Sequence, residues 1–300
     1  MRLITDRVTL TVPATTANLG PGFDTFGMAF ELRDRVAVRA VAGKSQVTVH
    51  GEGVETASAG EDHLVVKAIR VGLEYCGAPQ AGLELVCHNA IPHSRGLGSS
   101  ASAVVVGLAA ARALVSDPEV LDDYTLLRLA TEFEGHPDNA APAVYGGARL
   151  AWMSDGLPQS VPLEVVPSLH PVALIPETHA LTSTARAALP QSVPYRDAVF
   201  NLQRAALLVE ALRTGEHLMT ATDDRLHQPY RREVMPESFE LIDALRARGV
   251  PAALSGAGPT VLAFGDVDDA LTAALVKHGW RVLPLPVTQR GVAVVDSDRA

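Results

Sequence analysis

The segment IPHSRGLGSSAS (residues 91–102) has the residue types of a phosphate-binding loop. Gly96 and Gly98 permit positive φ angles and let a ligand approach the main chain closely. Ser99 and Ser100 stand at the expected start of a helix, where backbone N–H groups lack partners and the helix dipole is positive. The segment lacks the lysine of a Walker-type loop. We therefore predict an anion site built mainly from backbone groups.

Two kinds of side chain could add charge to this loop. Arg95 is a candidate for direct contact with the anion, and a serine hydroxyl at the helix start is a candidate Mg²⁺ ligand. The alternative is an ordinary strand-to-helix turn in which Ser99 is a simple N-cap. Because glycine-rich loops are common, this segment alone does not decide between the two interpretations.

Two further glycine-rich clusters favour a ligand site. They are TTANLGPGFD (residues 15–24) and LSGAGPT (residues 254–260), and each follows a strand pattern. Each combines small residues with polar ones, so a ligand could approach the backbone there. Three such clusters in one chain are more easily explained by a shared site than by three unrelated turns.

Composition excludes several classes of partner. The chain has 300 residues, enough for one large or two ordinary domains, and a net charge of −9 without any cluster of lysine and arginine. We therefore expect neither nucleic-acid nor membrane binding. Two cysteines are too few for a disulfide scaffold. With no signal-peptide pattern and no apolar run near the ~20 residues that span a bilayer, we expect a cytoplasmic protein.

Hydrophobic periodicity predicts strands and helices in mixed order, without a regular βαβ repeat. The predicted strands are residues 8–12, 35–39, 46–50, 83–87, 144–152, 172–175, 252–255, 261–264 and 291–295. The predicted helices are residues 63–75, 101–115, 124–133, 196–213, 239–248 and 267–277. This order favours an α+β fold with largely antiparallel sheets. A loop with Pro158 and Pro162 suggests two domains, residues 1–157 and 158–300.

Together the three clusters resemble the motifs of the small-molecule kinase superfamily of galactokinase, homoserine kinase, mevalonate kinase and phosphomevalonate kinase. The family's second motif, P-x-x-x-G-L-G-S-S-A, stands at Pro92–Ala101, and its third at Ser255–Pro259. The first motif, TANLGPGFD (residues 16–24), is similar to that of homoserine kinases. So are EGHPDN (134–139), STARAALP (183–190) and DRLHQPYR (224–231). The resemblance thus covers nearly the whole chain.

This resemblance implies a fold and a reaction. The N-terminal, nucleotide-binding part would be like domain 2 of ribosomal protein S5, and the C-terminal part would be ferredoxin-like. ATP would phosphorylate the side-chain hydroxyl of L-homoserine with the help of Mg²⁺. The product would be O-phospho-L-homoserine, for threonine biosynthesis. Homodimers are frequent in the family, so a homodimer is a further expectation.

The resemblance also assigns a nucleotide loop and a metal site. The nucleotide-binding residues would be Pro92, His93, Ser94, Arg95, Gly96, Leu97, Gly98, Ser99, Ser100, Ala101 and Ser102. Ser100 and Glu134 would bind Mg²⁺, for which oxygen ligands are typical. Glu132 is the rival, because the short Glu-Gly-His link leaves the alignment of the glutamate open. The segment at residues 62–65 is a candidate for the adenine site only by its place before a helix.

Homoserine is a zwitterion, which defines what its site needs. Its carboxylate requires a guanidinium, and Arg186 and Arg231 match family arginines tied to the substrate. The remaining polar contacts implied by the family are Asn18, Asp24, His136 and Asn139. Taken alone, each arginine could be a surface cation, Asn18 a turn residue and His136 a structural histidine.

The catalytic residues implied by the resemblance are Ser100, Asp138 and Asn139. Asp138 matches the position of the catalytic aspartate of mevalonate kinases, whereas homoserine kinases are thought to act by transition-state stabilisation without a dedicated base. Asp138 is therefore either a general base or a structural residue that orients His136 or a loop. Our hypothesis is that it is structural.

Two other functions stay open. A related kinase could act on another small alcohol such as mevalonate, although the segment 18–24 and the pair of Arg186 and Arg231 speak against it. A catalytically silent relative could keep the fold without the chemistry. The presence of Ser99, Ser100 and Glu134 makes that reading the weaker one.

Overall fold

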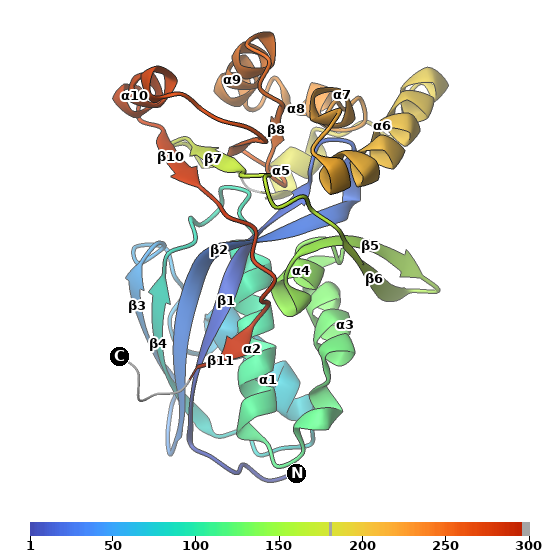
Figure 1. Cartoon of the computed structure of the whole chain (residues 1–300). Coiled ribbons are helices and arrows are strands. Elements are labelled where there is room, and N and C mark those ends of the chain that lie inside the picture. The colour runs from blue at the N-terminus through green and yellow to red at the C-terminus, as the bar shows by residue number, and fades with distance from the viewer. Residues whose placement is uncertain (180–181, 296–300) are drawn as a thin grey trace.

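The computed structural model describes residues 1–179 and 182–295, and these build two largely antiparallel sheets with helices packed on them (Figure 1). The strands are β1 (Arg7–Asn18), β2 (Gly22–Val41), β3 (Gln46–Gly51), β4 (Gly82–Asn89), β5 (Ala148–Ser154), β6 (Leu157–Leu163), β7 (Val172–Ile175), β8 (Ala252–Leu254), β9 (Val261–Ala263), β10 (Arg281–Pro284) and β11 (Ala293–Val294). The α-helices are α1 (Leu64–Tyr75), α2 (Ser99–Leu114), α3 (Asp123–Glu134), α4 (Ala140–Tyr145), α5 (Thr182–Ala187), α6 (Tyr195–Thr214), α7 (Leu218–Ala221), α8 (Gln228–Arg231), α9 (Pro236–Ala247) and α10 (Asp269–Lys277). Two 3-10 turns, η1 (Gly60–Asp62) and η2 (Pro118–Leu121), precede α1 and α3.

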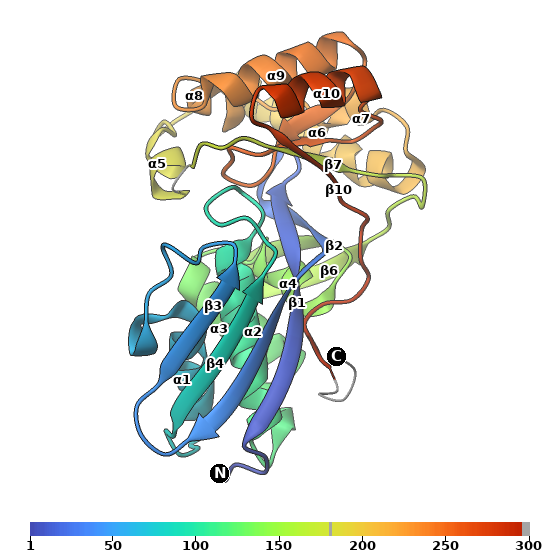
Figure 2. The ribbon, with the colours of Figure 1, turned by 90° about the vertical axis from the view of Figure 1, so that its left-hand side faces the viewer.

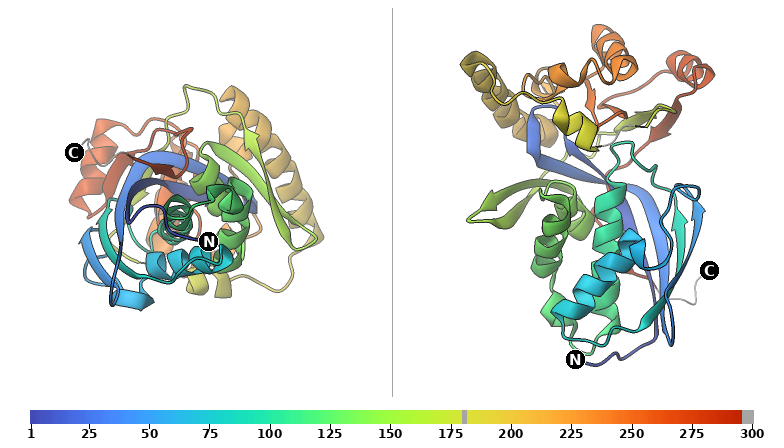
Figure 3. Two further views of the ribbon diagram at one scale, coloured as in Figure 1. Left: turned by 90° about the horizontal axis from the view of Figure 1, so that it is seen from below. Right: turned by 180° about the vertical axis from the view of Figure 1, so that it is seen from behind.

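The larger sheet has seven strands and forms the lower part of the molecule in Figure 2. Its main path is β11-β1-β2-β4-β3, and the hairpin β5–β6 joins through pairing of β5 with β2. All of these pairings are antiparallel except β3 with β4. Helices α1, α2, α3 and α4 lie on one side of the sheet, as the view from behind shows (Figure 3). Their apolar side chains and those of β1, β2 and β4 form the core of this part.

Helix α2 is the helix that the phosphate-loop prediction requires. It covers most of the helix predicted at residues 101–115, has an apolar sequence, and most of its residues are buried between α1, α3 and the sheet. The hydroxyl of Ser102, wholly buried one turn into α2, donates a hydrogen bond to the carbonyl of Pro13 at 2.8 Å. This contact fixes the first turn of α2 against strand β1.

The smaller sheet has the order β10-β7-β9-β8 and is antiparallel throughout. With helices between β7 and β8 and α10 between β9 and β10, this order is the ferredoxin-like arrangement. The predicted α+β class and the ferredoxin-like C-terminal part are therefore confirmed. Among the helices of the described chain, none is both long and apolar enough to cross a membrane.

The structure corrects the predicted strand at residues 144–152. Val144 and Tyr145 end helix α4, and the strand begins at Ala148. Gly146 and Gly147, with φ angles of 76° and 70°, turn the chain between the two elements. The stretch read as one strand is therefore a helix end, a turn and a strand.

Other differences concern pairing over long distances. Strand β2 has 20 residues, far more than the predicted 35–39, because its first half pairs with β5 and its second half with β4. Strand β6 lies where a loop was predicted, and strand β10 and the short helices α5, α7 and α8 were not predicted. The expected boundary after residue 157 falls within β6, which pairs with β5, and β11 returns to pair with β1. The division into domains stays a prediction.

Candidate active site

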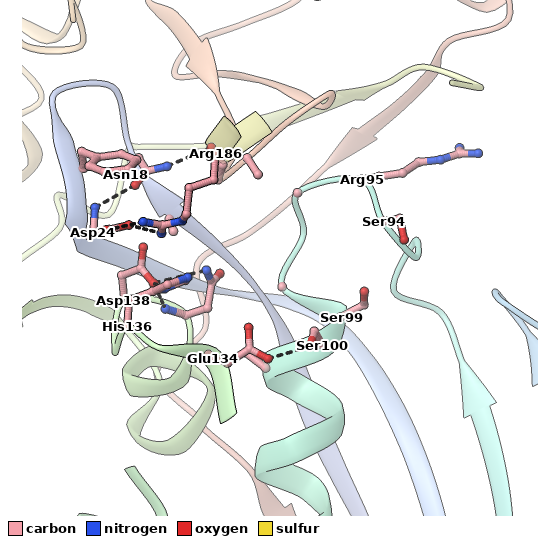
Figure 4. Close-up of a pocket in the computed structure, with 18 of the residues that line it drawn as sticks. Asn18, Asp24, Ser94, Arg95, Ser99, Ser100, Glu134, His136, Asp138 and Arg186 are labelled. Carbon is pink, nitrogen blue, oxygen red and sulfur yellow. Dashed lines mark hydrogen bonds and ion pairs between the residues drawn. The ribbon is translucent and has the colours of Figure 1, made fainter. Parts of the chain in front are cut away.

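A cavity lies between the two sheets, at the start of α2. It is lined by Ala17, Asn18, Phe23, Asp24, Ser94, Arg95, Gly96, Gly98, Ser99, Ser100, Ala101, Glu134, His136, Asp138, Asn139, Arg186, Arg231, Gly256 and Ala257. The residues labelled in Figure 4 come from the first and second glycine clusters, the end of α3, the loop before α4 and helix α5, and Arg231 of α8 and the third cluster complete the lining. Residues from distant parts of the sequence thus share one space.

The loop before α2 has the backbone that its glycines predicted. Gly96 and Gly98 have φ angles of 78° and 70°. A Cβ atom at Gly96 would lie 2.1 Å from the carbonyl oxygen of Ser255, and one at Gly98 would lie 1.9 Å from Oγ1 of Thr15. Both positions therefore require glycine for space as well as for conformation. The first N–H groups of α2 have no partner within the helix, and Ser99, Ser100 and Ala101 at this end line the cavity.

The three glycine clusters are bonded to one another. The hydroxyl of Ser255 donates to the carbonyl of Gly96 at 2.6 Å and is 2.7 Å from the hydroxyl of Thr16. The amide of Asn18 donates to the carbonyl of Gly256 at 2.8 Å, and its carbonyl oxygen accepts from the N–H of Asp24 at 3.0 Å. The polar residues of each cluster thus position the backbone of another.

Ser100 and Glu134 form an oxygen pair at the mouth of the loop. The hydroxyl of Ser100 donates to Oε1 of Glu134 at 2.6 Å (Figure 4). Glu132 instead accepts a hydrogen bond from Arg128 at 2.8 Å on the surface of α3. It is not among the described residues that line the cavity. A hydroxyl and a carboxylate at this spacing suit a hard cation such as Mg²⁺.

Two arginines converge on the opposite end of the cavity. Arg186 donates hydrogen bonds to both carboxylate oxygens of Asp24, at 2.8 and 3.0 Å, and this bonding to Asp24 raises the pKa of Arg186. The centroid of the Phe23 ring is 5.4 Å from the guanidinium carbon of Arg186 and 5.6 Å from that of Arg231. The aromatic ring is thus in reach of both cations of the site.

Arg231 is buried, and its contacts fix its direction. Its Nε donates to the carbonyl of Ala185 at 3.2 Å, and its Nη1 donates to the carbonyl of Gly256 at 3.2 Å and to His227. Burial, followed by the nearby Arg186, lowers the pKa of Arg231 to about 10. The guanidinium is therefore still charged at neutral pH.

His136, Asp138 and Asn139 form a compact polar group beside Asp24. Oδ1 of Asp138 is hydrogen-bonded to Nδ1 of His136 and accepts from the backbone N–H of Asn139 at 2.9 Å. Burial lowers the pKa of His136, but the hydrogen bond and the charge of Asp138 outweigh it, and the net shift is upward. Asn139 also accepts from the hydroxyl of Thr15 at 2.9 Å.

Comparison with known proteins decides what kind of site this is. The chain matches the GHMP kinases N terminal domain over residues 63–147 and the GHMP kinases C terminal domain over residues 203–281. It is 48% identical to the homoserine kinase of Streptomyces avermitilis over 96% of this chain and 95% of that one. It is 49% identical to the homoserine kinase of Streptomyces coelicolor over 96% of this chain and 94% of the other. The chain belongs to the homoserine kinase branch of the GHMP kinase family.

Solved structures agree with this membership. The crystal structure of the homoserine kinase from Cytophaga hutchinsonii has a TM-score of 0.82 and 27% identity, covering 97% of this chain and 98% of that one. The crystal structure of L. major mevalonate kinase in complex with R-mevalonate has a TM-score of 0.70 and 16% identity, covering 96% of this chain and 99% of that one. The second likeness shows a shared fold alone. As a member of this family the chain is a kinase that uses ATP.

Some residues expected in the nucleotide loop of the kinase do not line this cavity in the described chain. Leu97 and Ser102 are buried in the core, and Pro92 is buried at the loop's start. His93 instead lines an adjoining second cavity, which shares Ser94, Ser99 and Ser100 with the first. The predicted loop therefore contains both cavity-lining residues and residues that hold the loop in place.

The second cavity lies behind the loop, between β2, β4 and α1. Its apolar walls are formed by Val12, Val36, Leu64, Val65, Ala103 and Val106, and its ionisable groups are Asp34, Asp62, His63, Cys87 and His93. Oδ1 of Asp34 accepts from the backbone N–H groups of Ala90 and Ile91 at 2.7 and 2.9 Å. Burial raises the pKa of Asp34 to about 6 in spite of these bonds.

Sequence reasoning missed several residues that organise the site. Phe23 and His227 lie within quoted motifs but were given no role, and Thr15, Thr16 and Ser255 were treated as parts of loops. For His227 a signal existed, since Asp224 and His227 are three residues apart before a short helix that begins at Gln228. Oδ2 of Asp224 accepts from the N–H groups of His227 and Gln228 at 3.0 and 2.7 Å, as a helix-capping carboxylate does.

Proposed function

We propose that this kinase transfers the γ-phosphoryl group of ATP to the side-chain hydroxyl of L-homoserine, giving O-phospho-L-homoserine for threonine biosynthesis. The observation that carries the proposal is the composition of the main cavity. One end has an anion-binding helix start with Ser100 and Glu134, and the other has a carboxylate and two arginines. A phosphate donor and a small zwitterion would therefore meet in one space.

The substrate end suits an amino acid. Arg231 is charged and directed by buried contacts, and Arg186 has a planar fork that can hold a carboxylate with two hydrogen bonds. In the structure Asp24 uses that fork, so a substrate carboxylate would compete with Asp24 for Arg186. Once released, Asp24 and Oδ1 of Asn18 are acceptors for the substrate ammonium group.

The phosphate end would act by charge stabilisation. Phosphoryl transfer depends mainly on positioning and on neutralising charge at the transferred group. The N–H groups of the loop at residues 96–100 would donate to the phosphates, and Ser100 and Glu134 would hold Mg²⁺. When bound there, Mg²⁺ would neutralise phosphate charge. The adenine would occupy the second cavity, whose apolar walls adjoin the loop through Ser94 and Ser99.

Asp138 is proposed as a positioning residue. Its carboxylate is buried and already engaged with His136 and the backbone of Asn139, which supports a structural role. If Asp138→Asn folds normally but loses more than about 10³-fold in kcat, the structural role is refuted and a general base is favoured.

The test of the function is a coupled ADP-release assay with Mg-ATP. L-Homoserine is compared with mevalonate, galactose, L-serine and L-threonine at equal concentrations. Turnover with L-homoserine alone is the expected result. Turnover with another alcohol instead would leave the ATP site standing and reject the roles of Arg186 and Arg231. ATP binding without turnover of any alcohol would indicate a catalytically silent relative.

We also propose that the kinase forms a homodimer. Light scattering coupled to size-exclusion chromatography, measured over a hundredfold range of protein concentration, tests this directly. A mass of one chain at every concentration would refute it.

A further inference from the structure

Helix α6 carries an exposed apolar stripe on the outside of the molecule. Tyr195, Val199, Leu202 and Val209 are 85%, 36%, 71% and 40% exposed, and Ala206 between them is exposed as well. Large apolar side chains at this exposure are costly in water, and five in a row on one helix are unusual for a free surface. The opposite side of α6, with Leu208, Ala211 and Leu212, is buried in the core.

The spacing of the stripe is that of a helix–helix seam. Its members follow one another at intervals of four, three, four and three residues, which is the 3.5-residue repeat of side chains that pack between two helices. A random surface would not keep this repeat over 15 residues. The pattern therefore indicates a second helix as the neighbour of α6.

The hairpin β5–β6 continues the apolar surface beside α6, and the two lie side by side in Figures 1 and 3. Leu150 and Leu163 lie on one face of the hairpin, near the end where it joins the rest of the sheet, and pack against the same core cluster as the buried side of α6. The register places Trp152, Val161 and Leu157 on the same face, nearer the tip, where they are exposed. One face of the hairpin is thus packed against the core at its base and carries exposed apolar side chains towards its tip.

The free edge of β6 is unsuited to pairing with another strand. Within the sheet of the described chain β6 pairs with β5, and two of its seven residues, Pro158 and Pro162, lack an N–H group. Because they are four residues apart, both lie on the same edge of β6, and a proline in a sheet is placed with its missing N–H on the side away from the neighbouring strand. A neighbour would therefore contact this region through side chains and not by extending the sheet.

The charges beside the stripe specify the neighbour. Arg196, Gln203 and Glu210 are seven residues apart, so they share one flank of the exposed stripe. If two copies of α6 pack antiparallel about a two-fold axis at Gln203, Arg196 of each copy faces Glu210 of the other. Gln203 then faces its own equivalent. Glu210 already accepts from Arg213 at 2.6 and 2.9 Å and keeps free lone pairs for a second guanidinium.

We propose that the kinase dimerises through α6, which packs antiparallel against α6 of a second copy, with the exposed face of the hairpin β5–β6 extending the contact. The surface is self-complementary in charge, as an isologous two-fold interface requires. A stable interface buries about 800 Å² on each partner, for which a stripe of five side chains needs the added area of the hairpin. This inference rests on the proposed homodimer and does not depend on the substrate.

The first experiment measures the dimer dissociation constant by analytical ultracentrifugation. Leu202→Glu should raise it at least about 100-fold, because two carboxylates would meet near the two-fold axis without partners. Val276→Glu is the matched control, since Val276 is a similarly exposed apolar residue on the distant helix α10. It should leave the constant within about twofold. Circular dichroism and thermal unfolding of each variant verify that it is folded.

A charge exchange identifies the partner as a second copy. Arg196→Glu and Glu210→Arg alone should each weaken the dimer about tenfold, because like charges then face each other twice. The double variant should return to within about threefold of the wild type, since the pairs are restored in reverse. A dimer insensitive to all of these changes would refute this surface and leave the homodimer standing. A monomer at every concentration would refute both, and neither result bears on the ADP-release assay.

Discussion

Arg231 donates a hydrogen bond from Nη1 to Nδ1 of His227 at 3.0 Å, and both side chains are buried. Nε2 of His227 is 2.7 Å from the carbonyl oxygen of Gly20. Because a guanidinium can only donate and a carbonyl can only accept, this network assigns the proton of the imidazole to Nε2. Burial is the main influence on the pKa of His227 and lowers it, which favours the same neutral form. His227 therefore links Gly20 of the first motif to an arginine of the substrate site.

From this link we expect His227→Leu to impair substrate binding more than chemistry. Arg231 would lose one hydrogen-bond acceptor while remaining buried and charged, and a buried donor without its partner costs about 1–3 kcal/mol of free energy. This corresponds to an increase in KM for L-homoserine of about tenfold or more, with a smaller change in kcat. His227→Gln, which retains an acceptor, should recover part of the loss, and the exposed His217→Asn should have no effect. A fall in kcat at unchanged KM would argue against a positioning role.

The two glutamates of α3 form a natural pair of variants. Glu134→Gln should raise the Mg²⁺ concentration for half-maximal activity more than about tenfold, because it replaces a carboxylate beside Ser100 by a neutral amide. Glu132→Gln, which removes a surface ion pair with Arg128, should stay within about twofold of the wild type. Magnesium titrations of both variants at saturating ATP measure this. The reverse ranking would transfer the metal role to Glu132.

Arg186→Ala should raise KM for L-homoserine about 10- to 100-fold and leave KM for ATP nearly unchanged. The expected cause is loss of the bidentate grip on the substrate carboxylate. Arg186→Lys should recover only part of the affinity, because an ammonium group cannot form the planar pair. Arg225→Ala, which removes an arginine paired with Asp197 outside the cavity, is the control. Equal effects on both substrates would contradict this assignment.

Stability should depend on pH through Asp34. Its pKa is raised to about 6 by burial, so the folded protein holds a proton that the unfolded chain releases near pH 4. The folded state therefore loses stability as the pH rises from about 4 to 6. Asp34→Asn can still accept from Ala90 and Ile91 without burying a charge, so it should be more stable than the wild type at pH 8 by about 2–3 kcal/mol.

The advantage of Asp34→Asn should shrink towards zero as the pH falls to 4, because the folded wild-type carboxyl is then protonated and the unfolded one is about half protonated. Urea unfolding at pH 4, 6 and 8 without ATP measures it, with Asp155→Asn in the exposed turn between β5 and β6 as the control. A variant that is less stable than the wild type at pH 8 would show that the charge of Asp34 is compensated in the fold.

The sequence patterns correctly predicted those helices and loops whose structure depends on residues close together in the chain. The periodicity around α1 and α2 and the glycines before α2 were sufficient for those helices and for the conformation of the loop. The length of β2, the presence of β6 and the strand β10 depend on partners far along the chain, such as Arg149 opposite Gly27. Residue patterns within one window hold no information on such partners.

The same division applies to the site. The residue types of the loop at 92–102 and the motif segments predicted which residues would gather, and the cavity contains most of them. The partners could not be predicted. Asp24 and Arg186 are 162 residues apart in sequence, and Ser255 and Gly96 are 159 apart. These contacts depend on how the two sheets pack against each other, and this packing cannot be predicted from the residue types and spacing within one segment.

The pairing of β11 with β1 has a consequence for synthesis of the chain. Leu10 and Thr11 receive their outer neighbours, Val294 and Ala293, only after nearly the whole protein has been made. On the ribosome, the first strand therefore keeps an open edge while the rest of its sheet assembles, and open edges invite association with other nascent chains. A chaperone that binds at this stage would meet a sheet that is complete except for β11. A stop codon shortly before residue 293 would leave the sheet permanently without that strand.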